Sequence, residues 1–249
     1  MEQFTIRIAG NAVAVTSKSR YSRKNCEAYL CDDEPDFAVE LKPQDIDFER
    51  VVAEQERAME GLPKKVFADY VLERTALQRK IAEKFFEYDI LLFHGSVIAV
   101  DGEGYLFTAK SGTGKSTHTR LWREMLGERA IMVNDDKPFL RVLPDRVFVC
   151  GSPWNGKHSL GSNIDVPLKA ICIVERGESN EITQISNNEA VPMLLQQSNR
   201  PLQPALLPKY LELVEKIANK TNFYRLKCNM DPEAALISYQ TMSGKVKEN

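Results

Sequence analysis

The chain has 249 residues, of which 43% are apolar and 27% are charged. These proportions are typical of globular domains and exclude a wholly disordered chain, a collagen and a coiled coil. Lysine and arginine together number 33, and aspartate and glutamate 35, so the formal net charge is -2. Because a nearly neutral chain has no general attraction for polyanions, we expect no nucleic-acid partner.

No segment of the sequence is apolar enough to cross a membrane. The best candidate, residues 90–100, is eleven residues long and is interrupted by His94, Gly95 and Ser96, whereas a spanning helix needs about 20 apolar residues. The amino terminus carries an acidic residue and has no apolar signal core. The five cysteines form no Cys-x-x-Cys pair, which predicts reduced thiols and no zinc site. We therefore expect a cytoplasmic protein without a membrane partner.

The first part of the chain, residues 1–62, predicts a small β-rich subdomain. Short runs of strand-forming residues lie at 4–8, 13–15, 29–31 and 37–41. Gly10-Asn11 between the first two runs is typical of a hairpin turn. Gly61-Leu62-Pro63 then breaks the chain, and proline is well suited to the first turn of a helix. Apolar residues recur at helical spacing from Val66 to Tyr88, which predicts a helix there.

The remainder, residues 63–249, predicts an α/β domain. Further strands are expected at 90–93, 97–100, 105–108, 131–133, 147–150, 168–174 and 223–228. Between them we expect a helix from Lys115 to Leu126 that ends at Gly127, and an amphipathic helix over 210–218. Asp231-Pro232 is typical of one more helix start. This order predicts a twisted mixed sheet with flanking helices.

The strongest signal for function directly follows the strand expected at 105–108. Residues 109–117 match the phosphate-binding pattern G-x-x-x-x-G-K-[ST], with Ala109 in place of the first glycine. In such a loop, backbone N–H groups turn toward phosphate oxygens at a helix N-terminus, where the helix dipole favours negative charge. Lys115 then reaches the β- and γ-phosphates, and the Ser116 hydroxyl binds Mg²⁺.

We therefore expect a nucleotide-binding P-loop. Its residues are Ser111, Gly112, Thr113, Gly114, Lys115, Ser116 and Thr117. The alternative interpretation is an ordinary glycine-rich turn that opens a helix.

Two neighbouring carboxylates follow the next expected strand. Asn134-Asp135-Asp136-Lys137 occupies the place where P-loop enzymes keep a carboxylate that faces Mg²⁺ and the γ-phosphate. One carboxylate can be held by the metal and Lys115, while the other accepts a proton from an incoming hydroxyl. We expect Asp136 and Ser116 as metal ligands, and the sequence leaves open which aspartate is the base. Taken alone, the same stretch is also typical of a turn.

Three segments in a fixed order carry a family resemblance. Phe93-His94-Gly95-Ser96, then Ser111–Thr117, then Asn134-Asp135-Asp136 resemble the nucleotide site shared by HPr kinase/phosphorylases and ATP-dependent phosphoenolpyruvate carboxykinases. The former have a His-Gly before a G-x-S-G-x-G-K-S loop and an Asp-Asp after the next strand. Without this context, a lone histidine in an apolar run is typical of a hydrogen-bonded core residue.

The resemblance implies roles for individual residues. Lys115 and Ser116 would bind phosphate and metal, Asp135 or Asp136 would be the base, and His94 would lie beside the transferred phosphoryl group. It also implies a fold of the carboxykinase and HPr kinase type, ATP and Mg²⁺ as cofactors, and a homo-oligomer. Carboxykinases are far longer and have an arginine-lined dicarboxylate site without a counterpart here, so we do not expect that activity.

The chain differs from HPr kinases after the Asp-Asp segment. Where those enzymes have Glu-Ile-Arg-Gly, residues 151–158 read Gly-Ser-Pro-Trp-Asn-Gly-Lys-His. If the strand before this segment runs parallel to its neighbours, the segment lies at the sheet edge that binds ligands in open α/β folds. We then expect Trp154, Asn155, Lys157 and His158 to contact the phosphoryl acceptor. The alternative is a turn shaped by glycine and proline alone.

Together these features predict an ATP- and Mg²⁺-dependent kinase. It would transfer the γ-phosphoryl group to a hydroxyl of a protein or peptide serine or of a small metabolite, with His94, Lys115, Asp135 and Asp136 as catalytic residues. One alternative is a nucleotide-binding regulator or scaffold that keeps the P-loop and transfers nothing. Another is an ATPase or GTPase switch, for which the sequence lacks an Asn-Lys-x-Asp motif.

Overall fold

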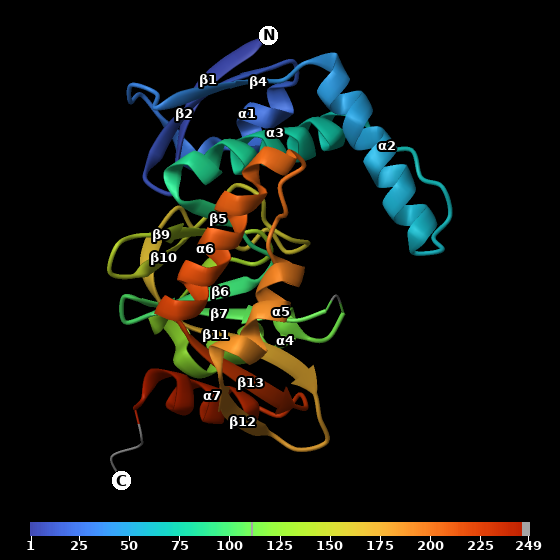
Figure 1. Cartoon of the computed structure of the whole chain (residues 1–249). Helices are drawn as coiled ribbons and strands as arrows, with labels where there is room; N and C mark the ends of the chain where they lie inside the picture. The colour runs from blue at the N-terminus through green and yellow to red at the C-terminus, as the bar shows by residue number, and fades with distance from the viewer. Residues whose placement is uncertain (111, 246–249) are drawn as a thin grey trace. The chain divides into compact units, whose positions relative to one another are not determined.

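A computed structural model describes residues 1–110 and 112–245 (Figure 1). By their contacts the residues form two units, the first comprising Met1–Lys84 and the second beginning at Phe85. The sequence placed the boundary near residue 62, and the division into a β-rich subdomain and a kinase domain stays a prediction, because contacts do not show function. Within the described ranges, no helix has both the length and the apolar character that a membrane span requires.

The first unit is built on a four-stranded sheet with the order β3-β1-β2-β4. The predicted hairpin is confirmed, since β1 (Glu2–Ile8) and β2 (Asn11–Ser17) pair antiparallel around Gly10, whose φ of 80° favours glycine. β3 (Leu30–Cys31) pairs with β1, and β4 (Phe37–Glu40) runs parallel to β2. All four strands overlap segments that the sequence predicted, and β1 and β2 are longer than those segments.

The helices of this unit were only partly predicted. They are α1 (Arg20–Asn25), the short 3-10 helix η1 (Glu27–Tyr29), α2 (Pro43–Met59) and α3 (Asp69–Phe85). α2 escaped the periodicity analysis because ion pairs, and few apolar residues, join it to α3. The Arg79 Nε atom lies 2.6 Å from the Glu49 Oε1 atom, and the Lys80 Nζ atom lies 2.9 Å from Asp45 Oδ2. The helix predicted from Val66 begins three residues later, and Val66 is exposed.

The second unit contains, within the described residues, a nine-stranded mixed sheet, as predicted. Its strands are β5 (Ile90–Leu92), β6 (Ser96–Val100), β7 (Glu103–Thr108), β8 (Ala130–Asn134), β9 (Phe139–Val142), β10 (Val147–Cys150), β11 (Asp165–Arg176), β12 (Glu181–Ile185) and β13 (Asn222–Cys228). The strand order is β5-β9-β10-β11-β7-β6-β8, and β13 joins β11 to β12. The sequence did not predict β9 and β12.

The directions of the strands determine which loops meet. β6 is antiparallel to both β7 and β8, and β11 is parallel to β7. The carboxyl ends of β7, β8 and β11 and the amino end of β6 therefore share one edge of the sheet. β10 is antiparallel to β11, so the condition that the strand before residues 151–158 runs parallel to its neighbours is not met.

Helices cover both faces of this sheet (Figure 1). They are α4 (Lys115–Leu126) and α7 (Glu233–Ser243) on one face, and α5 (Asn187–Gln197) and α6 (Leu207–Lys220) on the other, with the 3-10 helices η2 (Phe86–Tyr88), η3 (Gly127–Arg129) and η4 (Pro204–Leu206). Each helix pair packs on its own apolar cluster of sheet residues. α4 has the bounds that the sequence predicted. α5 was not predicted, because Pro192 lies inside it.

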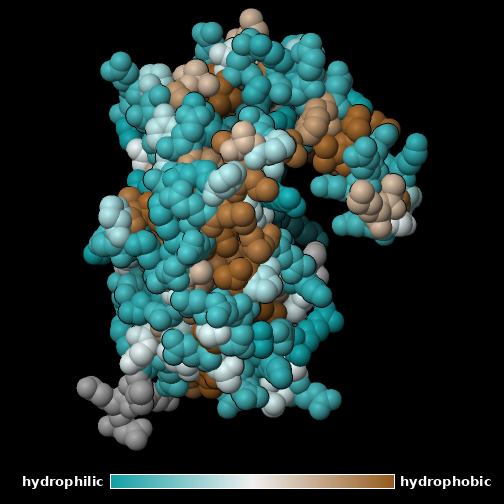
Figure 2. Space-filling model, in the orientation of Figure 1, coloured by the Kyte–Doolittle hydropathy of each residue, from teal (hydrophilic) through white to brown (hydrophobic). Residues whose placement is uncertain are grey.

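Apolar side chains also reach the surface on the face covered by α5 and α6. Three leucines there are each more than a third exposed. They are Leu195 in α5, Leu202 in the segment after α5, and Leu211 in α6. Figure 2 shows an apolar surface over these two helices. These leucines therefore lie outside the buried core.

Candidate active site

A cavity of about 440 Å³ lies at the sheet edge where β6 begins and β7 and β8 end. We call it the edge cavity. Its lining residues come from three segments singled out in the sequence and from residues 156–158. They are His94, Gly112, Gly114, Lys115, Ser116, Thr117, Asp135, Asp136, Gly156, Lys157 and His158. The structure thus brings together segments that are far apart in the chain.

One wall of the edge cavity is formed by Gly112, Gly114 and the first turn of α4. We call the described residues of the range 109–114 the glycine loop. Gly112 and Gly114 have φ of 75° and 128°, which L-residues rarely adopt. Ala109, by contrast, does not have a positive φ, so its methyl group is compatible with the loop. Ser111, which the sequence predicted as a nucleotide-binding residue, lies outside the described residues.

The N-terminus of α4 opens directly into this cavity. No side chain caps it, and its first helical hydrogen bond runs from the His118 N–H to the Gly114 carbonyl oxygen. An α-helix leaves its first N–H groups without partners inside the helix. Here they belong to Gly114 and the next three residues, all of which line the cavity. This end of the helix is therefore suited to an anion.

Lys115 adds a cation to the same wall. Its Nζ atom donates a hydrogen bond to the Ala109 carbonyl oxygen at 2.9 Å, so the side chain lies back along the glycine loop. Burial lowers the pKa of Lys115 from its ordinary value, although Asp136 opposes the shift. A buried ammonium gains most from an anionic partner, because water screens it poorly.

His94 also lines the edge cavity, and both of its ring nitrogens have polar partners. Its Nδ1 atom lies 2.9 Å from the Gln197 Oε1 atom, and its Nε2 atom lies 3.3 Å from the Asp136 Oδ1 atom. The His94 backbone N–H also donates to the Gln197 carbonyl oxygen. His94 is therefore a positioned side chain of the cavity. Sequence reasoning missed Gln197, since nothing near it in the chain indicates a site.

Asp136 carries the negative charge that faces this histidine. Burial raises the pKa of the Asp136 carboxyl, but the hydrogen bond from His94, together with Lys137 and Lys115, outweighs it and holds the pKa below its ordinary value. The carboxylate is thus ionised at neutral pH. It can accept a proton or hold a cation.

Asp135 is held by a different group. Its Oδ1 atom accepts a hydrogen bond from the Gly156 N–H at 2.6 Å, and its carbonyl oxygen accepts one from the Ser96 hydroxyl. A Cβ atom at Gly156 would lie 3.3 Å from the Asp136 Cβ atom. The absence of a side chain at Gly156 therefore allows this segment to lie directly against both aspartates.

Asn134 connects the aspartates to residues 151–158. It is fully buried, and its Oδ1 atom accepts the backbone N–H groups of Asp136 and Lys137 at 2.9 and 2.6 Å. Its Nδ2 atom donates to the Ser152 carbonyl and hydroxyl oxygens and to Asn155 Oδ1. The sequence assigned no role of its own to Asn134, and a side chain that accepts from its own following backbone is typical of turns.

Two of the four expected acceptor contacts line the edge cavity. Lys157 and His158 do so and are exposed. Trp154 does not, since it is only 3% exposed and its ring meets the Phe139 ring edge-on at 6.1 Å between centroids. The expectation that the Trp154 side chain contacts the acceptor is therefore not met, because its ring is used in core packing. The Asn155 side chain is engaged by Asn134 and does not line the cavity.

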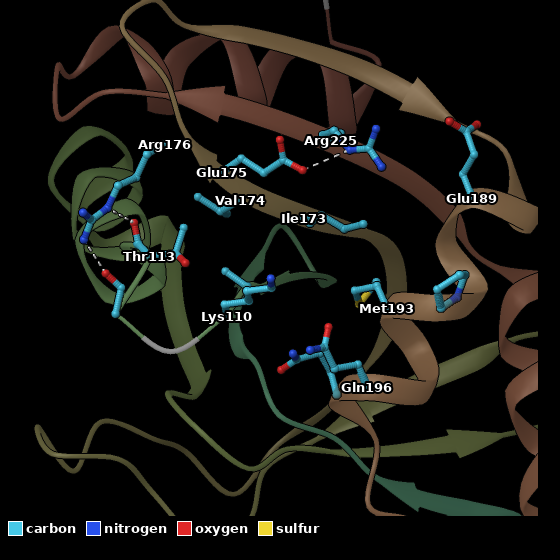
Figure 3. A pocket seen from close by; sticks show the side chains of 14 residues that line it. Lys110, Thr113, Ile173, Val174, Glu175, Arg176, Glu189, Met193, Gln196 and Arg225 are labelled. Carbon is cyan, nitrogen blue, oxygen red and sulfur yellow. Dashed lines mark hydrogen bonds and ion pairs between the residues drawn. The ribbon is translucent and has the colours of Figure 1, made fainter. Parts of the chain in front are cut away.

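Sequence reasoning also missed Arg176, the last residue of β11. Its Nη2 atom donates to the Gly112 carbonyl oxygen at 2.6 Å, and its Nε atom donates to the Thr113 carbonyl oxygen at 3.5 Å (Figure 3). The carbonyl and N–H groups of one peptide unit point in opposite directions. Arg176 therefore holds these carbonyls on its own side of the loop. Its place at the shared sheet edge is the signal that could have found it.

The described residues contain no group of three or more histidines, cysteines, aspartates or glutamates that could hold a metal ion. The candidate metal ligands Ser116 and Asp136 both line the edge cavity. A cation there would therefore share its coordination with a ligand such as phosphate, as Mg²⁺ commonly does.

Comparisons with known proteins give a family and a likeness to solved structures. The family model of the SynChlorMet cassette protein ScmC matches residues 70–244. Among curated proteins, no significant match is found. Among solved structures, the chain is similar to the Hpr(Ser) kinase/phosphatase from Coxiella burnetii, with 13% identity, 62% of this chain and 95% of that chain covered, and a TM-score of 0.35.

Proposed function

We propose that this chain, which belongs to the ScmC family of SynChlorMet cassette proteins, is a phosphotransferase that moves the γ-phosphoryl group of ATP to a hydroxyl. One observation carries the proposal. The edge cavity places the uncapped N-terminus of α4 and Lys115 in one cavity with His94, Asp135 and Asp136. Phosphoryl transfer needs this combination, because one wall binds phosphate and the other orients the attacking hydroxyl.

The glycine loop would act as a P-loop. The N–H groups of the first turn of α4 and the Lys115 ammonium would bind the β- and γ-phosphates. Arg176 supports this role, since it holds two loop carbonyls outside the cavity. Positive charge at this wall also stabilises the charge on the equatorial oxygens of the transferred group.

Mg²⁺ fits the oxygen donors of the edge cavity. The Ser116 hydroxyl is exposed at the start of α4, and the Asp136 carboxylate is held in its ionised form. Hydroxyl and carboxylate oxygens are ligands that Mg²⁺ prefers, together with water and phosphate. When bound, the ion would neutralise charge on the β- and γ-phosphates.

The two aspartates would divide the remaining work. The carboxylate that does not hold the cation accepts the proton of the attacking hydroxyl, which is general-base catalysis. His94 keeps the Asp136 carboxylate ionised and oriented through its 3.3 Å contact. The acceptor would approach along residues 156–158, where Lys157 and His158 are exposed. The hydroxyl belongs to a protein or peptide serine or to a small metabolite. A cytoplasmic location and a homo-oligomeric state stay predictions.

Transfer of labelled phosphate tests this proposal. Wild-type protein is incubated with γ-labelled ATP, Mg²⁺ and fractions of a cell lysate that contain either proteins or metabolites. We expect label to appear in one fraction. Asp135→Asn and Asp136→Asn should each reduce the transfer, and loss of the base should cost roughly 10² to 10⁴ in rate. At least one of these variants should still bind ATP, because a base acts mainly in the transition state.

A matched control is Asp145→Asn, which removes an exposed carboxylate paired with Arg146 and should leave transfer unchanged. Bound ATP that is never consumed, together with a partner whose affinity depends on the nucleotide, would favour the regulator. Absence of both binding and transfer would contradict any nucleotide-dependent role.

A further inference from the structure

Three cavities meet at the glycine loop. Besides the edge cavity, a cavity of about 780 Å³ lies between the end of β11 and α5, and we call it the α5 cavity. Another, of about 480 Å³, lies between α4 and residues 228–230 before α7, and we call it the α7 cavity. Gly112 lines all three. A nucleotide with its phosphates in the edge cavity could therefore extend toward either neighbour.

The edge cavity is more continuous with the α7 cavity. Gly112, Gly114 and Thr117 line both of these cavities. Among the described residues, the α5 cavity and the edge cavity share only Gly112. A ligand can thus pass from the edge cavity into the α7 cavity along the first turn of α4.

Arg176 separates the two neighbouring cavities. It lines both of them, and its bonds to the Gly112 and Thr113 carbonyl oxygens fix it across the loop (Figure 3). A guanidinium held this way presents a flat cationic face, which favours contact with an aromatic ring.

The two cavities also differ in their charged side chains. Glu175 and Glu189 line the α5 cavity together with Lys110, Arg176 and Arg225, and Glu175 is paired there with Arg225 (Figure 3). No aspartate or glutamate occurs among the described residues that line the α7 cavity. The α5 cavity is therefore the more densely charged of the two, and the α7 cavity is the better place for an uncharged part of the nucleotide.

The lining of the α7 cavity fits an aromatic, uncharged group. Leu121, Val174 and Met230 give apolar walls, and Met230 is 76% exposed. A flexible thioether of this kind makes favourable contacts with aromatic rings. We propose that the α7 cavity is a nucleobase site, which takes the base of a nucleoside triphosphate whose phosphates lie in the edge cavity. This inference rests on the proposed function.

The same lining predicts weak discrimination between bases. The Asn229 side chain is already engaged, because its Nδ2 atom donates to the Glu178 carbonyl oxygen and its Oδ1 atom accepts the Asp231 N–H. His118 is only 2% exposed. Stacking would therefore be the main contact with the base. Because every base has a face that stacks, this contact would hardly distinguish one base from another. We expect the dissociation constants of ATP and GTP to agree within about tenfold, because an apolar pocket discriminates poorly between similar ligands.

Tryptophan fluorescence tests the nucleobase site with ligands of known structure. Met230→Trp places a reporter in the α7 cavity, and the matched variant Gln196→Trp places one in the α5 cavity at another exposed position. The native Trp122 and Trp154 are buried and give a constant background. Each protein is titrated with Mg²⁺ and ATP, and separately with Mg²⁺ and inorganic tripolyphosphate, while its melting temperature is also recorded.

We expect ATP to quench the Met230→Trp variant, tripolyphosphate to leave its emission unchanged, and the Gln196→Trp variant to respond to neither. Met230→Trp should also bind ATP about fivefold or more tightly than wild type, because the indole adds stacking. If ATP or tripolyphosphate raises the melting temperature but Met230→Trp emission stays constant, the nucleobase site is wrong and the phosphate site stands. If neither ligand stabilises any of the proteins, the proposed function fails and the nucleobase site fails with it.

Discussion

The Nε2 atom of His94 lies 3.3 Å from the Oδ1 atom of Asp136, although the two residues precede β6 and follow β8. The sheet brings them together, because the amino end of β6 and the carboxyl end of β8 share one edge. The contact joins a ring that can carry a proton to a carboxylate whose pKa is lowered from its ordinary value.

We predict that His94→Gln slows phosphoryl transfer by roughly 100-fold or more, since the imidazole no longer orients the Asp136 carboxylate beside the transferred group. The dissociation constant for ATP should change little, because the phosphates would be held by Lys115 and the N-terminus of α4 and not by His94. His158→Gln is the comparison, as it removes the other histidine of the edge cavity and leaves the His94–Asp136 contact intact. Because His158 would contact the acceptor, this variant should raise the KM for the acceptor and leave the turnover number unchanged. Equal losses of turnover number in the two variants would contradict a specific role for His94.

Lys115→Met should abolish stabilisation of the protein by ATP and Mg²⁺. A ligand at a hundred times its dissociation constant adds about 2.7 kcal/mol, which raises the melting temperature of a chain of this size by roughly 5 to 10 °C. Differential scanning fluorimetry measures the shift. The control is Lys110→Met, which removes another cation of the glycine loop. Lys110 lines the α5 cavity and does not line the edge cavity. This variant should keep most of the shift, and loss of the shift in both variants would indicate a general charge effect.

Trp154 and Lys157 should behave differently although they are three residues apart. Trp154→Ala removes a buried ring beside Phe139 and should lower the free energy of unfolding by about 3 to 5 kcal/mol. Lys157→Ala alters an exposed side chain and should leave stability unchanged within about 0.5 kcal/mol. It should raise the KM for the acceptor while the KM for ATP stays the same. If Trp154→Ala were as stable as wild type but bound the acceptor poorly, the result would indicate that the Trp154 side chain contacts the acceptor.

His118 should make the fold sensitive to acid. Burial lowers the pKa of His118 to about 4 from an ordinary value of 6.5. Below pH 6.5 the unfolded chain takes up a proton at this ring and the folded chain does not, so stability falls as the pH drops from 6.5 to about 4. The loss is on the order of 3 kcal/mol. Urea unfolding of wild type and His118→Phe at several pH values measures this loss. If the two proteins had identical pH profiles, His118 would take up protons equally in the folded and the unfolded chain, which would contradict the prediction.

The sequence predicted the main sheet, α4 and the segments that meet in the edge cavity, because each has a local signal. The glycine loop with Lys115 has a fixed spacing, and the Asp135-Asp136 pair follows a strand that is apolar and short. Local signals fail where an element is stabilised by distant partners. α2 is joined to α3 by ion pairs such as Arg79 with Glu49, which leave no apolar periodicity.

The same limit explains the errors at the site. Trp154 is flanked by turn residues, and only the three-dimensional contact with Phe139 shows that it is a core residue. Gln197 and Arg176 reach the site through side-chain hydrogen bonds to His94 and to the glycine loop. Such bonds depend on tertiary packing, and a single sequence carries no pattern for them.

A crystal structure of the protein with Mg²⁺ and a non-hydrolysable ATP analogue shows whether the edge cavity binds the phosphates of a nucleotide. We predict that the β- and γ-phosphates contact Lys115 and the backbone N–H groups of the first turn of α4, with the γ-phosphate facing Asp135 and Asp136. A structure in which the analogue binds elsewhere, while the glycine loop and Lys115 contact no phosphate, would contradict the account.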